Sequence, residues 1–419
     1  MARRAMALLS RWSSRVFSVE LNGAPFYFSI QEQHRGGGFW VFAEVPDRHR
    51  CYSLLVCSGD RIKRVKFHAE LREKLLRALP PDCDVSPMSS FLPNVKDSVI
   101  KGYFLTDRSE SPHSSERLLR DLLRQDPVLV CSYSRGEDGQ VWTQHPWSPA
   151  DSQATKMSKM YYVMHAEAPE YHPSTLSIIN SDVFYSFEEA RKVLEKCSDI
   201  IPEASSIMDL LPSRVEAGSK PDFPVIVIEG LDATGKTTLT ESLRDALGAP
   251  LLRSPPQCLS PMRARFDQEP SLIRRAFYAL GNYITAEEVG REGGKAPVIV
   301  DRFWHSTAAY AIATAVSGPV CNLPAEGSEV YRWPSDLLQP SLVVLLTLDP
   351  EERKRRLRDR GQTKTEEEQE LDHNRLFRLK VEEAYRRISG PACVTVDASP
   401  SADQVFRQVQ LLIRGKCHL

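Results

Sequence analysis

The second half of the chain alternates short apolar runs with longer segments that carry helical patterns. Four apolar runs predict buried strands, at residues 224–229, 297–301, 341–349 and 393–397. Five segments around them predict helices, at residues 237–247, 270–289, 350–360, 366–388 and 401–414. Strands that alternate with helices indicate an α/β domain, in which a parallel sheet carries helices on both faces.

The first half has a different pattern, in which strand-like runs outnumber helical segments. Strand candidates are residues 15–21, 25–30, 38–45, 52–58, 127–133 and 160–165. Helix candidates are residues 67–78, 114–125 and 186–196. Two polar stretches, 106–116 and 145–158, predict exposed loops. This pattern predicts an α+β domain, and no constellation of chemically reactive residues marks its role.

A segment rich in Pro, Ser, Gly and charge separates the two halves. Residues 211–224 read Leu-Pro-Ser-Arg-Val-Glu-Ala-Gly-Ser-Lys-Pro-Asp-Phe-Pro, a composition typical of a linker. A chain of 419 residues is long enough for two domains. We predict an N-terminal domain over 16–212, a linker over 213–222 and a C-terminal domain over 223–419.

The start of the chain has the composition of a targeting segment. Four arginines, Arg3, Arg4, Arg11 and Arg15, precede the first acidic residue, Glu20. A segment that is rich in arginine and serine, poor in acid and amphipathic is typical of a mitochondrial transit peptide. We predict such a peptide over 1–15, in preference to a disordered basic tail, and hence a mitochondrial protein.

The overall composition excludes several classes of partner. The 54 basic and 55 acidic residues give a net charge of −1, so we predict no nucleic-acid partner. The nine cysteines form no Cys-x-x-Cys pair, which argues against a disulfide scaffold or a zinc site. No apolar run is long enough for a transmembrane helix.

A phosphate-binding loop follows the first strand of the C-terminal half. Residues 230–237 fit the pattern Gly-x-x-x-x-Gly-Lys-Ser/Thr between a predicted strand and a predicted helix. Glycines let backbone N–H groups surround phosphate oxygens, and the helix N-terminus adds a positive dipole. We expect Lys236 to neutralise phosphate charge and Thr237 to hold Mg²⁺. The predicted ATP-binding residues are Gly230, Leu231, Asp232, Ala233, Thr234, Gly235, Lys236, Thr237 and Thr238.

GTPases are excluded by a missing motif. The chain contains no Asn-Lys-x-Asp sequence, which these proteins use to recognise guanine. A match to Asp-x-x-Gly, from Asp245 to Gly248, lies in the helix after the loop, where it cannot act as a switch.

Two further groups of charged residues are candidates for phosphate chemistry. Asp301 and Arg302 end an apolar strand, and ligands of open α/β sheets bind at the carboxyl ends of strands. A carboxylate there can hold Mg²⁺, and an arginine can clamp an acceptor phosphate. Residues 353–360 read Arg-Lys-Arg-Arg-Leu-Arg-Asp-Arg. So many positive charges on one helix repel each other, and the arrangement is favourable if several of them bind phosphates. We expect two or three of these arginines to be functional.

Together these motifs resemble the thymidylate-kinase-like branch of the nucleoside monophosphate kinases. The similarity extends over about 222–414 and rests on residues 225–238, 300–302, 353–360 and 394–405, which follow the order of that family. The resemblance implies transfer of a phosphoryl group from ATP to a nucleoside monophosphate, with Mg²⁺ as the metal.

The resemblance also implies roles for particular residues. Asp232 is expected near the acceptor, and Arg253 and Arg302 are expected to hold the acceptor phosphate. In family members without an arginine in the loop, the arginine-rich segment supplies it. The implied catalytic residues are Lys236, Asp232, Arg302, Arg356, Arg358 and Arg360, and the implied metal residues are Thr237 and Asp301.

The base-binding segment departs from that of thymidylate kinases. Phe277 corresponds to the ring that stacks on the base, but Gly281 replaces the arginine that reads a carbonyl group. Arginine only donates hydrogen bonds, whereas Asn282 offers both a donor and an acceptor. With the predicted leader and the long N-terminal region, these departures resemble the family's mitochondrial pyrimidine kinases, which implies CMP, UMP, dCMP and dUMP as acceptors.

Two other functions fit parts of the pattern. A deoxynucleoside kinase shares the loop and the acidic strand end, and Asp301 would then act as the base for a sugar hydroxyl. A nucleotide-binding regulatory or interaction protein would use the kinase fold as a sensor. The sequence leaves the oligomeric state open, with a homodimer as one alternative.

Overall fold

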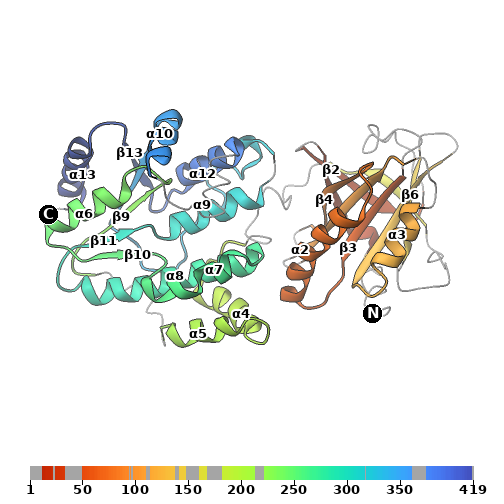
Figure 1. Cartoon of the computed structure of the whole chain (residues 1–419), viewed down its shortest axis with the longest axis horizontal. Helices are drawn as coiled ribbons and strands as arrows, with labels where there is room; N and C mark the ends of the chain where they lie inside the picture. Colours follow the sequence, from red (N-terminus) through yellow and green to blue (C-terminus); the bar gives the residue numbers. More distant parts are fainter. Residues whose placement is uncertain are drawn as a thin grey trace. The chain divides into compact units, whose positions relative to one another are not determined.

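The computed structural model divides the chain into two compact units, Met1–Thr175 and Leu176–Leu419 (Figure 1). The structure describes residues 12–21, 24–33, 50–93, 95, 98–109, 114–136, 141–147, 160–167, 182–212, 221–316, 318–360 and 374–417. Within these residues no helix combines the length and the apolar composition that a membrane span requires. All nine cysteines are free thiols.

In its described residues the N-terminal unit is a closed antiparallel barrel, with strand order β1-β2-β8-β7-β6-β3-β5-β4. The strands are β1 (Val16–Leu21), β2 (Ala24–Gln31), β3 (Arg50–Val56), β4 (Cys83–Phe91), β5 (Ile100–Asp107), β6 (Val128–Arg135), β7 (Trp142–Trp147) and β8 (Tyr161–His165). The barrel closes where β1 pairs with β4. Helices α2 (Arg61–Ala78) and α3 (Ser114–Leu122) pack on its outer surface. The sequence predicted strands and helices here, but not the closure of the strands into a barrel.

The sequence pattern did not predict strands β4, β5 and β7 of the barrel. The stretches 106–116 and 145–158 were predicted as loops, but the first begins in β5 and ends in α3, and the second begins in β7. Gly102 lies inside β5, where an added Cβ would meet the carbonyl oxygen of Leu54 at 1.9 Å. Here glycine marks a close approach of two strands and not a turn. The predicted strand 38–45 lies outside the described residues.

Two residues of the predicted transit peptide belong to the folded barrel. Trp12 is fully buried, and its indole N–H donates to Gln144 at 2.7 Å. Arg15 is also buried, and its Nε donates to the Ser90 hydroxyl at 2.8 Å. A leader that extends through residue 15 is therefore at odds with the barrel, because its removal would take both side chains away.

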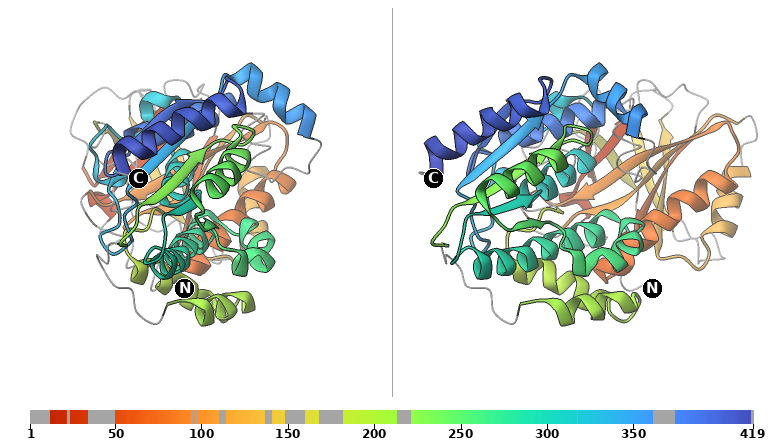
Figure 2. Two further views of the ribbon diagram at one scale, coloured as in Figure 1. Left: turned by 90° about the vertical axis from the view of Figure 1, so that its left-hand side faces the viewer. Right: turned by 60° about the vertical axis from the view of Figure 1, so that its left-hand side comes forward.

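The C-terminal unit contains a parallel sheet with strand order β10-β11-β9-β12-β13 in the described residues, which confirms the predicted α/β pattern (Figure 2). The strands are β9 (Val225–Gly230), β10 (Leu251–Arg253), β11 (Val298–Asp301), β12 (Leu342–Thr347) and β13 (Cys393–Asp397). The helices that surround or extend from the sheet are α6 (Lys236–Leu247), α7 (Ser260–Asp267), α8 (Ser271–Glu292), α9 (Trp304–Ala315), α10 (Pro350–Arg360), α12 (Arg375–Arg387) and α13 (Ala402–Cys417). The sequence pattern did not reveal β10, α7 or α9.

Helices cover both faces of this sheet. Along β9, Val225 and Val227 pack with residues of α8, α9 and α12, whereas Ile226 and Ile228 pack with residues of α6 and α13. Successive side chains of a strand point to opposite faces, so an uninterrupted apolar run is buried on both sides.

The C-terminal unit also includes two helices that the sequence assigned to the N-terminal domain. Helices α4 (Phe187–Cys197) and α5 (Pro202–Leu210) precede the predicted linker. The Phe187 ring packs edge-on against Tyr283 of α8, with ring centroids 5.3 Å apart, and the Phe187 N–H donates to Asp336 at 2.8 Å. These contacts place the division between the units earlier than the predicted boundary at 213–222.

Candidate active site

The loop between β9 and α6 contains two glycines with backbone conformations that other residues rarely adopt. Gly230 has a φ of +144° and Gly235 a φ of +88°. A Cβ at Gly230 would lie 2.6 Å from the Leu346 carbonyl oxygen on β12, so a side chain does not fit there. Thr234 donates its hydroxyl to the Leu231 carbonyl oxygen at 2.8 Å and fixes the turn. The loop leads directly into the N-terminus of α6, which favours a bound phosphate.

Lys236 is the first residue of α6, and its side chain is folded against the loop. It is only 8% exposed, and its Nζ donates to the Leu231 carbonyl oxygen at 2.8 Å. Burial lowers the pKa of Lys236 to about 8, and the positive charge of Arg302 acts in the same direction. A phosphate beside Nζ would favour the charged form and raise this pKa again.

Arg302 lies at the end of β11 and forms an ion pair with the loop. Its Nη2 donates to Asp232 Oδ1 at 2.7 Å, and its Nη1 donates to the Ser306 hydroxyl at 3.3 Å. Its backbone has a φ of +64°, an unusual value for a residue other than glycine, which turns the chain from β11 toward α9. Burial alone would raise the pKa of Asp232, but the charges of Arg302 and Lys236 outweigh it and lower that pKa.

Glu229 helps to hold Arg302 in place through Ser306, and the sequence did not predict this role. Its fully buried carboxylate accepts hydrogen bonds from the Phe303 N–H at 2.8 Å and from the Tyr385 hydroxyl at 3.1 Å. It also accepts a hydrogen bond from the Ser306 hydroxyl, which itself accepts one from Arg302. Burial raises the pKa of Glu229, although the hydrogen bond from Ser306 opposes this effect. The available signal was a charged residue in an otherwise apolar strand.

Asp301 and Thr237 provide oxygen atoms that suit Mg²⁺. Among the described residues, Asp301 Oδ1 is buried and accepts no hydrogen bond. Thr237 is exposed at the start of α6, and both residues line the same cavity. Mg²⁺ is usually held by one or two protein oxygens together with substrate phosphates and water. The donor set therefore fits this metal.

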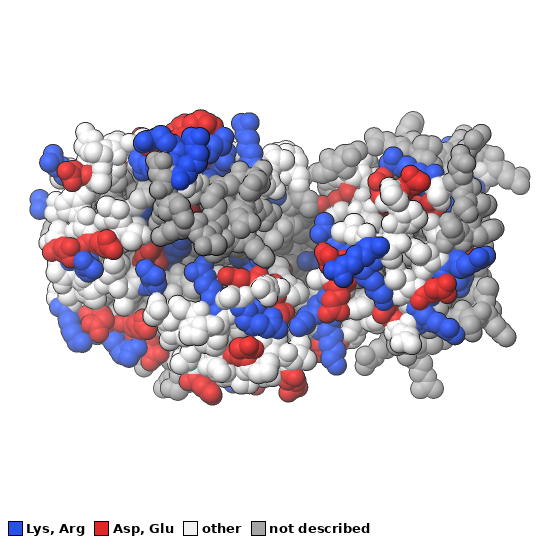
Figure 3. All heavy atoms as spheres, viewed as in Figure 1, with Lys and Arg blue, Asp and Glu red and all other residues white. Residues whose placement is uncertain are grey.

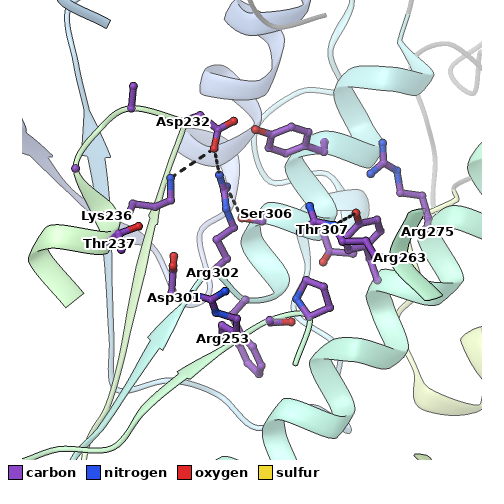
Figure 4. A pocket seen from close by; sticks show the side chains of 17 residues that line it. Asp232, Lys236, Thr237, Arg253, Arg263, Arg275, Asp301, Arg302, Ser306 and Thr307 are labelled. Carbon is purple, nitrogen blue, oxygen red and sulfur yellow. Dashed lines mark hydrogen bonds and ion pairs between the residues drawn. The ribbon is translucent and has the colours of Figure 1, made fainter. Parts of the chain in front are cut away.

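The loop and the ends of β10 and β11 surround a cavity of about 430 Å³ (Figure 4). Its charged lining residues are Lys236, Arg253, Arg263, Arg275, Arg302, Asp232 and Asp301. These are five cations and two carboxylates, so the lining carries three more positive than negative charges (5 − 2). Such an excess favours a ligand that carries several phosphate charges. The sequence predicted Arg253 and Arg302 but not Arg263 and Arg275.

Among the described side chains, the arginines predicted from the arginine-rich segment do not line this cavity. Arg356 donates to Glu352 at 2.9 Å and to the Ala398 carbonyl oxygen at 3.1 Å. Arg358 is exposed, and the side chain of Arg360 lies outside the described residues. The preceding Arg353 instead is buried, and its Nε donates to the Asp232 carbonyl oxygen in the loop at 3.1 Å. Helical phase directs Arg353, and neither Arg356 nor Arg358, toward the loop.

Phe277 lies in the core and not in the cavity wall. Its ring is fully buried and stacks on Phe266 of α7, with centroids 4.8 Å apart and an interplanar angle of 9°. The next residue, Tyr278, lines the cavity. This placement does not support base stacking by Phe277, because α7 covers the ring.

Asn282 lies behind the cavity wall and contacts two residues that form it. It is 1% exposed and makes hydrogen bonds with Ser254 and Thr307, both of which line the cavity. Asn282 was predicted to contact the ligand directly. Its buried position means that it would instead act on a ligand through the hydroxyl groups of Ser254 and Thr307.

Comparison with known proteins identifies relatives of both the C-terminal unit and the whole chain. The family model of thymidylate kinase matches residues 228–409. The human protein "UMP-CMP kinase 2, mitochondrial" is 43% identical over 377 residues, which cover 87% of this chain and 83% of that protein. A probable thymidylate kinase from Picrophilus torridus is 29% identical over 30% of this chain and 62% of its own length. A solved structure of Candida albicans thymidylate kinase aligns with a TM-score of 0.37 at 21% identity, covering 47% of this chain and 93% of that one.

The similarity to the human protein includes the N-terminal unit, since it extends over most of both chains. The family model independently matches the segment that contains the loop, Asp301, Arg302 and the arginine-rich segment. The chain therefore belongs to the thymidylate-kinase-like family of nucleoside monophosphate kinases, and its enzymatic class is that of a phosphotransferase.

Proposed function

We propose that the protein phosphorylates CMP, UMP, dCMP and dUMP to their diphosphates, with ATP as the donor and Mg²⁺ as the metal, in mitochondrial pyrimidine nucleotide supply. One observation carries this proposal: three separate motifs line a single cavity, through Lys236, through Arg253, and through the pair Asp301 and Arg302. The similarity to a human protein named as a mitochondrial UMP-CMP kinase supports the choice of acceptor and of compartment.

The proposed reaction moves the γ-phosphoryl group of ATP to an oxygen of the acceptor phosphate. The bond from that oxygen to phosphorus forms while the bond from phosphorus to the bridging oxygen of ADP breaks. Lys236 and the α6 N-terminus would bind the donor phosphates. Arg253 and Arg302 would hold the acceptor phosphate, since Arg253 pairs in register with Asp301 on the neighbouring strand.

Asp232 and Glu229 would keep the acceptor-side arginine in place. Asp232 pairs with the Arg302 guanidinium at 2.7 Å, and Glu229 binds the Ser306 hydroxyl that the same guanidinium contacts. Fixed orientation before binding lowers the barrier, because the charges need not reorganise during transfer. Thr237 and Asp301 would hold Mg²⁺, which when bound neutralises charge on the donor phosphates.

The arginine-rich segment would act on the loop in two ways. Arg353 already bonds the Asp232 carbonyl oxygen and would hold the loop in the form that binds phosphates. Arg356 would reach the transferring group only after a movement of α10, because it is bonded to Glu352 and to the Ala398 carbonyl oxygen. We propose that Arg358 and Arg360, which follow in the same helix, act together with it.

The decisive test compares acceptors that differ by one phosphate. The full-length protein is incubated with ATP and either CMP or cytidine, with and without Mg²⁺, and ADP formation is measured. We expect turnover with CMP and Mg²⁺ only. Turnover with cytidine would favour a deoxynucleoside or nucleoside kinase, and ATP binding without turnover on any acceptor would favour a regulatory protein.

A further inference from the structure

Asn282 connects two hydroxyl groups of the cavity wall through its carboxamide. The Ser254 hydroxyl donates to Asn282 Oδ1 at 2.6 Å, and Asn282 Nδ2 donates to Thr307 Oγ1 at 3.0 Å. Ser254 follows β10, Asn282 lies in α8 and Thr307 lies in α9, so the carboxamide joins three separate elements. Asn282 itself is buried, whereas Ser254 and Thr307 both line the cavity.

These hydrogen bonds decide what each hydroxyl can offer a ligand. Ser254 uses its proton on Asn282 and so presents only lone pairs to the cavity. Thr307 accepts from Asn282 and keeps its own proton, so it can donate into the cavity. One amide group thereby makes one hydroxyl an acceptor and the other a donor.

A half-turn of the carboxamide reverses this assignment. Rotation about the Cβ–Cγ bond exchanges Oδ1 with Nδ2, and this torsion is broad and nearly two-fold in asparagine. Both hydroxyls can donate or accept, so both hydrogen bonds survive the exchange. After it, Ser254 would donate into the cavity and Thr307 would accept.

Cytosine and uracil differ by the same reversal. Position 4 of cytosine carries an amino donor and position 3 an acceptor nitrogen, whereas uracil has a carbonyl acceptor at position 4 and an N–H donor at position 3. A wall with fixed donors rejects one of two such bases, because it leaves a buried polar group unpaired. A wall whose two hydroxyls reverse together can pair with either.

Gly281 allows this arrangement to form. A Cβ at Gly281 would lie 3.1 Å from Pro255 Cβ and 3.4 Å from Leu259 Cδ1. A Cβ there would require Pro255 to shift by a few tenths of an ångström. Gly281 thus suits the close packing of α8 against the segment that contains Ser254.

We propose that Asn282 is a positioning residue for base recognition, whose carboxamide takes opposite orientations with cytosine and uracil nucleotides and so lets one site accept both. This proposal rests on the proposed function. It adds a means of recognition that depends on Ser254, Asn282 and Thr307.

The first test replaces the Asn282 carboxamide by a group that cannot exchange a donor for an acceptor. The three side chains Ser254, Asn282 and Thr307 are called the relay. In Asn282→Asp, the carboxylate accepts from both hydroxyls, so each presents only lone pairs to the base. Cytosine then keeps its hydrogen bond at position 4 and loses the one at position 3, whereas uracil keeps the one at position 3 and loses the one at position 4. We expect kcat/KM to fall about tenfold or more for both CMP and UMP relative to the unchanged full-length protein.

A matched control lies one turn along the same helix. Thr285 is fully buried, and its hydroxyl donates to the Arg253 carbonyl oxygen at 3.0 Å. Thr285→Val removes a buried hydrogen bond of α8 without touching Ser254 or Thr307, so its loss of kcat/KM for either nucleotide should be several-fold smaller. An equal loss in both variants, or no loss in Asn282→Asp, would overturn the proposal.

The second test uses the unchanged protein and does not depend on the folding of a variant. Nuclear Overhauser contacts of the Asn282 amide protons are measured in complexes with CMP and with UMP. We expect contacts to Thr307 in one complex and to Ser254 in the other. The same neighbour in both complexes would refute the relay, while failure of the protein to phosphorylate either nucleotide would refute the proposed function instead.

Discussion

The barrel and the kinase unit both bury polar groups, but they do so in opposite ways. In the barrel, Trp12 donates to Gln144 at 2.7 Å, Gln144 donates to Tyr133 at 2.8 Å, and Tyr133 donates to Ser53 at 3.0 Å. In this chain of bonds Trp12, Gln144 and Tyr133 each donate to the next side chain, which stabilises a particular packing of the barrel core.

The kinase unit directs several of its polar groups toward a cavity. Lys236 is buried with a lowered pKa, and Asp301 Oδ1 accepts no hydrogen bond among the described residues. Burial of both groups costs stability in the free protein. Asp301 Oδ1 would gain a partner when a ligand binds, and Lys236 would gain one in addition to the Leu231 carbonyl oxygen. The comparison teaches that buried polar groups indicate a functional site where several of them line the same cavity. Buried polar groups that bond to one another inside a core instead stabilise the fold. Substitutions in the two units should therefore separate activity from stability.

The largest expected effect is on activity. Lys236→Ala removes the cation of the phosphate loop, and we expect kcat/KM to fall about 1000-fold or more with the unfolding temperature little changed. Lys354→Ala is the matched control, since Lys354 is exposed and its ion pair with Glu351, at 2.8 Å, lies on the surface. Near-normal turnover of Lys236→Ala would contradict the proposed role of the loop.

The converse effect is expected in the barrel. Trp12→Phe keeps an aromatic ring but removes the indole N–H and leaves the Gln144 oxygen without its donor. We expect the free energy of unfolding to fall by about 1–3 kcal/mol, with kcat for CMP unchanged. Chemical denaturation followed by circular dichroism, with a parallel kinase assay, measures both. A loss of activity in a folded variant would mean that the barrel takes part in catalysis.

A smaller effect distinguishes arginines of α10. Arg353→Ala removes the hydrogen bond to the loop backbone, and we expect KM for ATP to rise about tenfold. Arg358→Ala, at an exposed position of the same helix, should change it less than twofold if α10 stays where it is. If steady-state kinetics instead gave a larger rise of KM for Arg358→Ala than for Arg353→Ala, α10 would have to move so that its exposed arginines reach the phosphates.

The smallest expected effect is on the pH dependence of binding. The pKa of Lys236 in the free protein is about 8, so below pH 8 the amine is charged and above it the charge is lost. ATP would raise this pKa, so its affinity should fall up to about tenfold between pH 7 and pH 9, with proton uptake on binding at pH 8. Calorimetry in buffers of different ionisation enthalpy measures the uptake, and Lys236→Arg, which does not titrate in this range, should show none.

Local patterns predicted the parts of the kinase that neighbouring residues determine. The strand, the loop and the helix from β9 to α6 follow from glycine spacing and an apolar run. Arg302 was predicted from its place at the end of a strand, and Arg253 from the resemblance to the family. Long-range packing decided the rest. The ring of Phe277 is covered by α7, and α4 packs on α8 despite the linker that follows it in sequence.

The barrel was harder to predict because its strands lack the usual signals. Strand β4 carries Pro87, and β5 carries Gly102 at a close approach to β3. Both residues normally indicate a break in a strand. The buried positions of Trp12 and Arg15 likewise depend on contacts with β7 and β4, which the basic composition of the first residues cannot reveal.

The central claim is that the cavity transfers phosphate to pyrimidine monophosphates. It is tested most directly by ADP formation from ATP with the full-length protein and each common nucleoside monophosphate in turn. We predict turnover with CMP, UMP, dCMP and dUMP, and kcat/KM values for AMP and GMP at least about tenfold lower. Turnover confined to thymidylate or to purine monophosphates, or absent with all of them, would contradict the account.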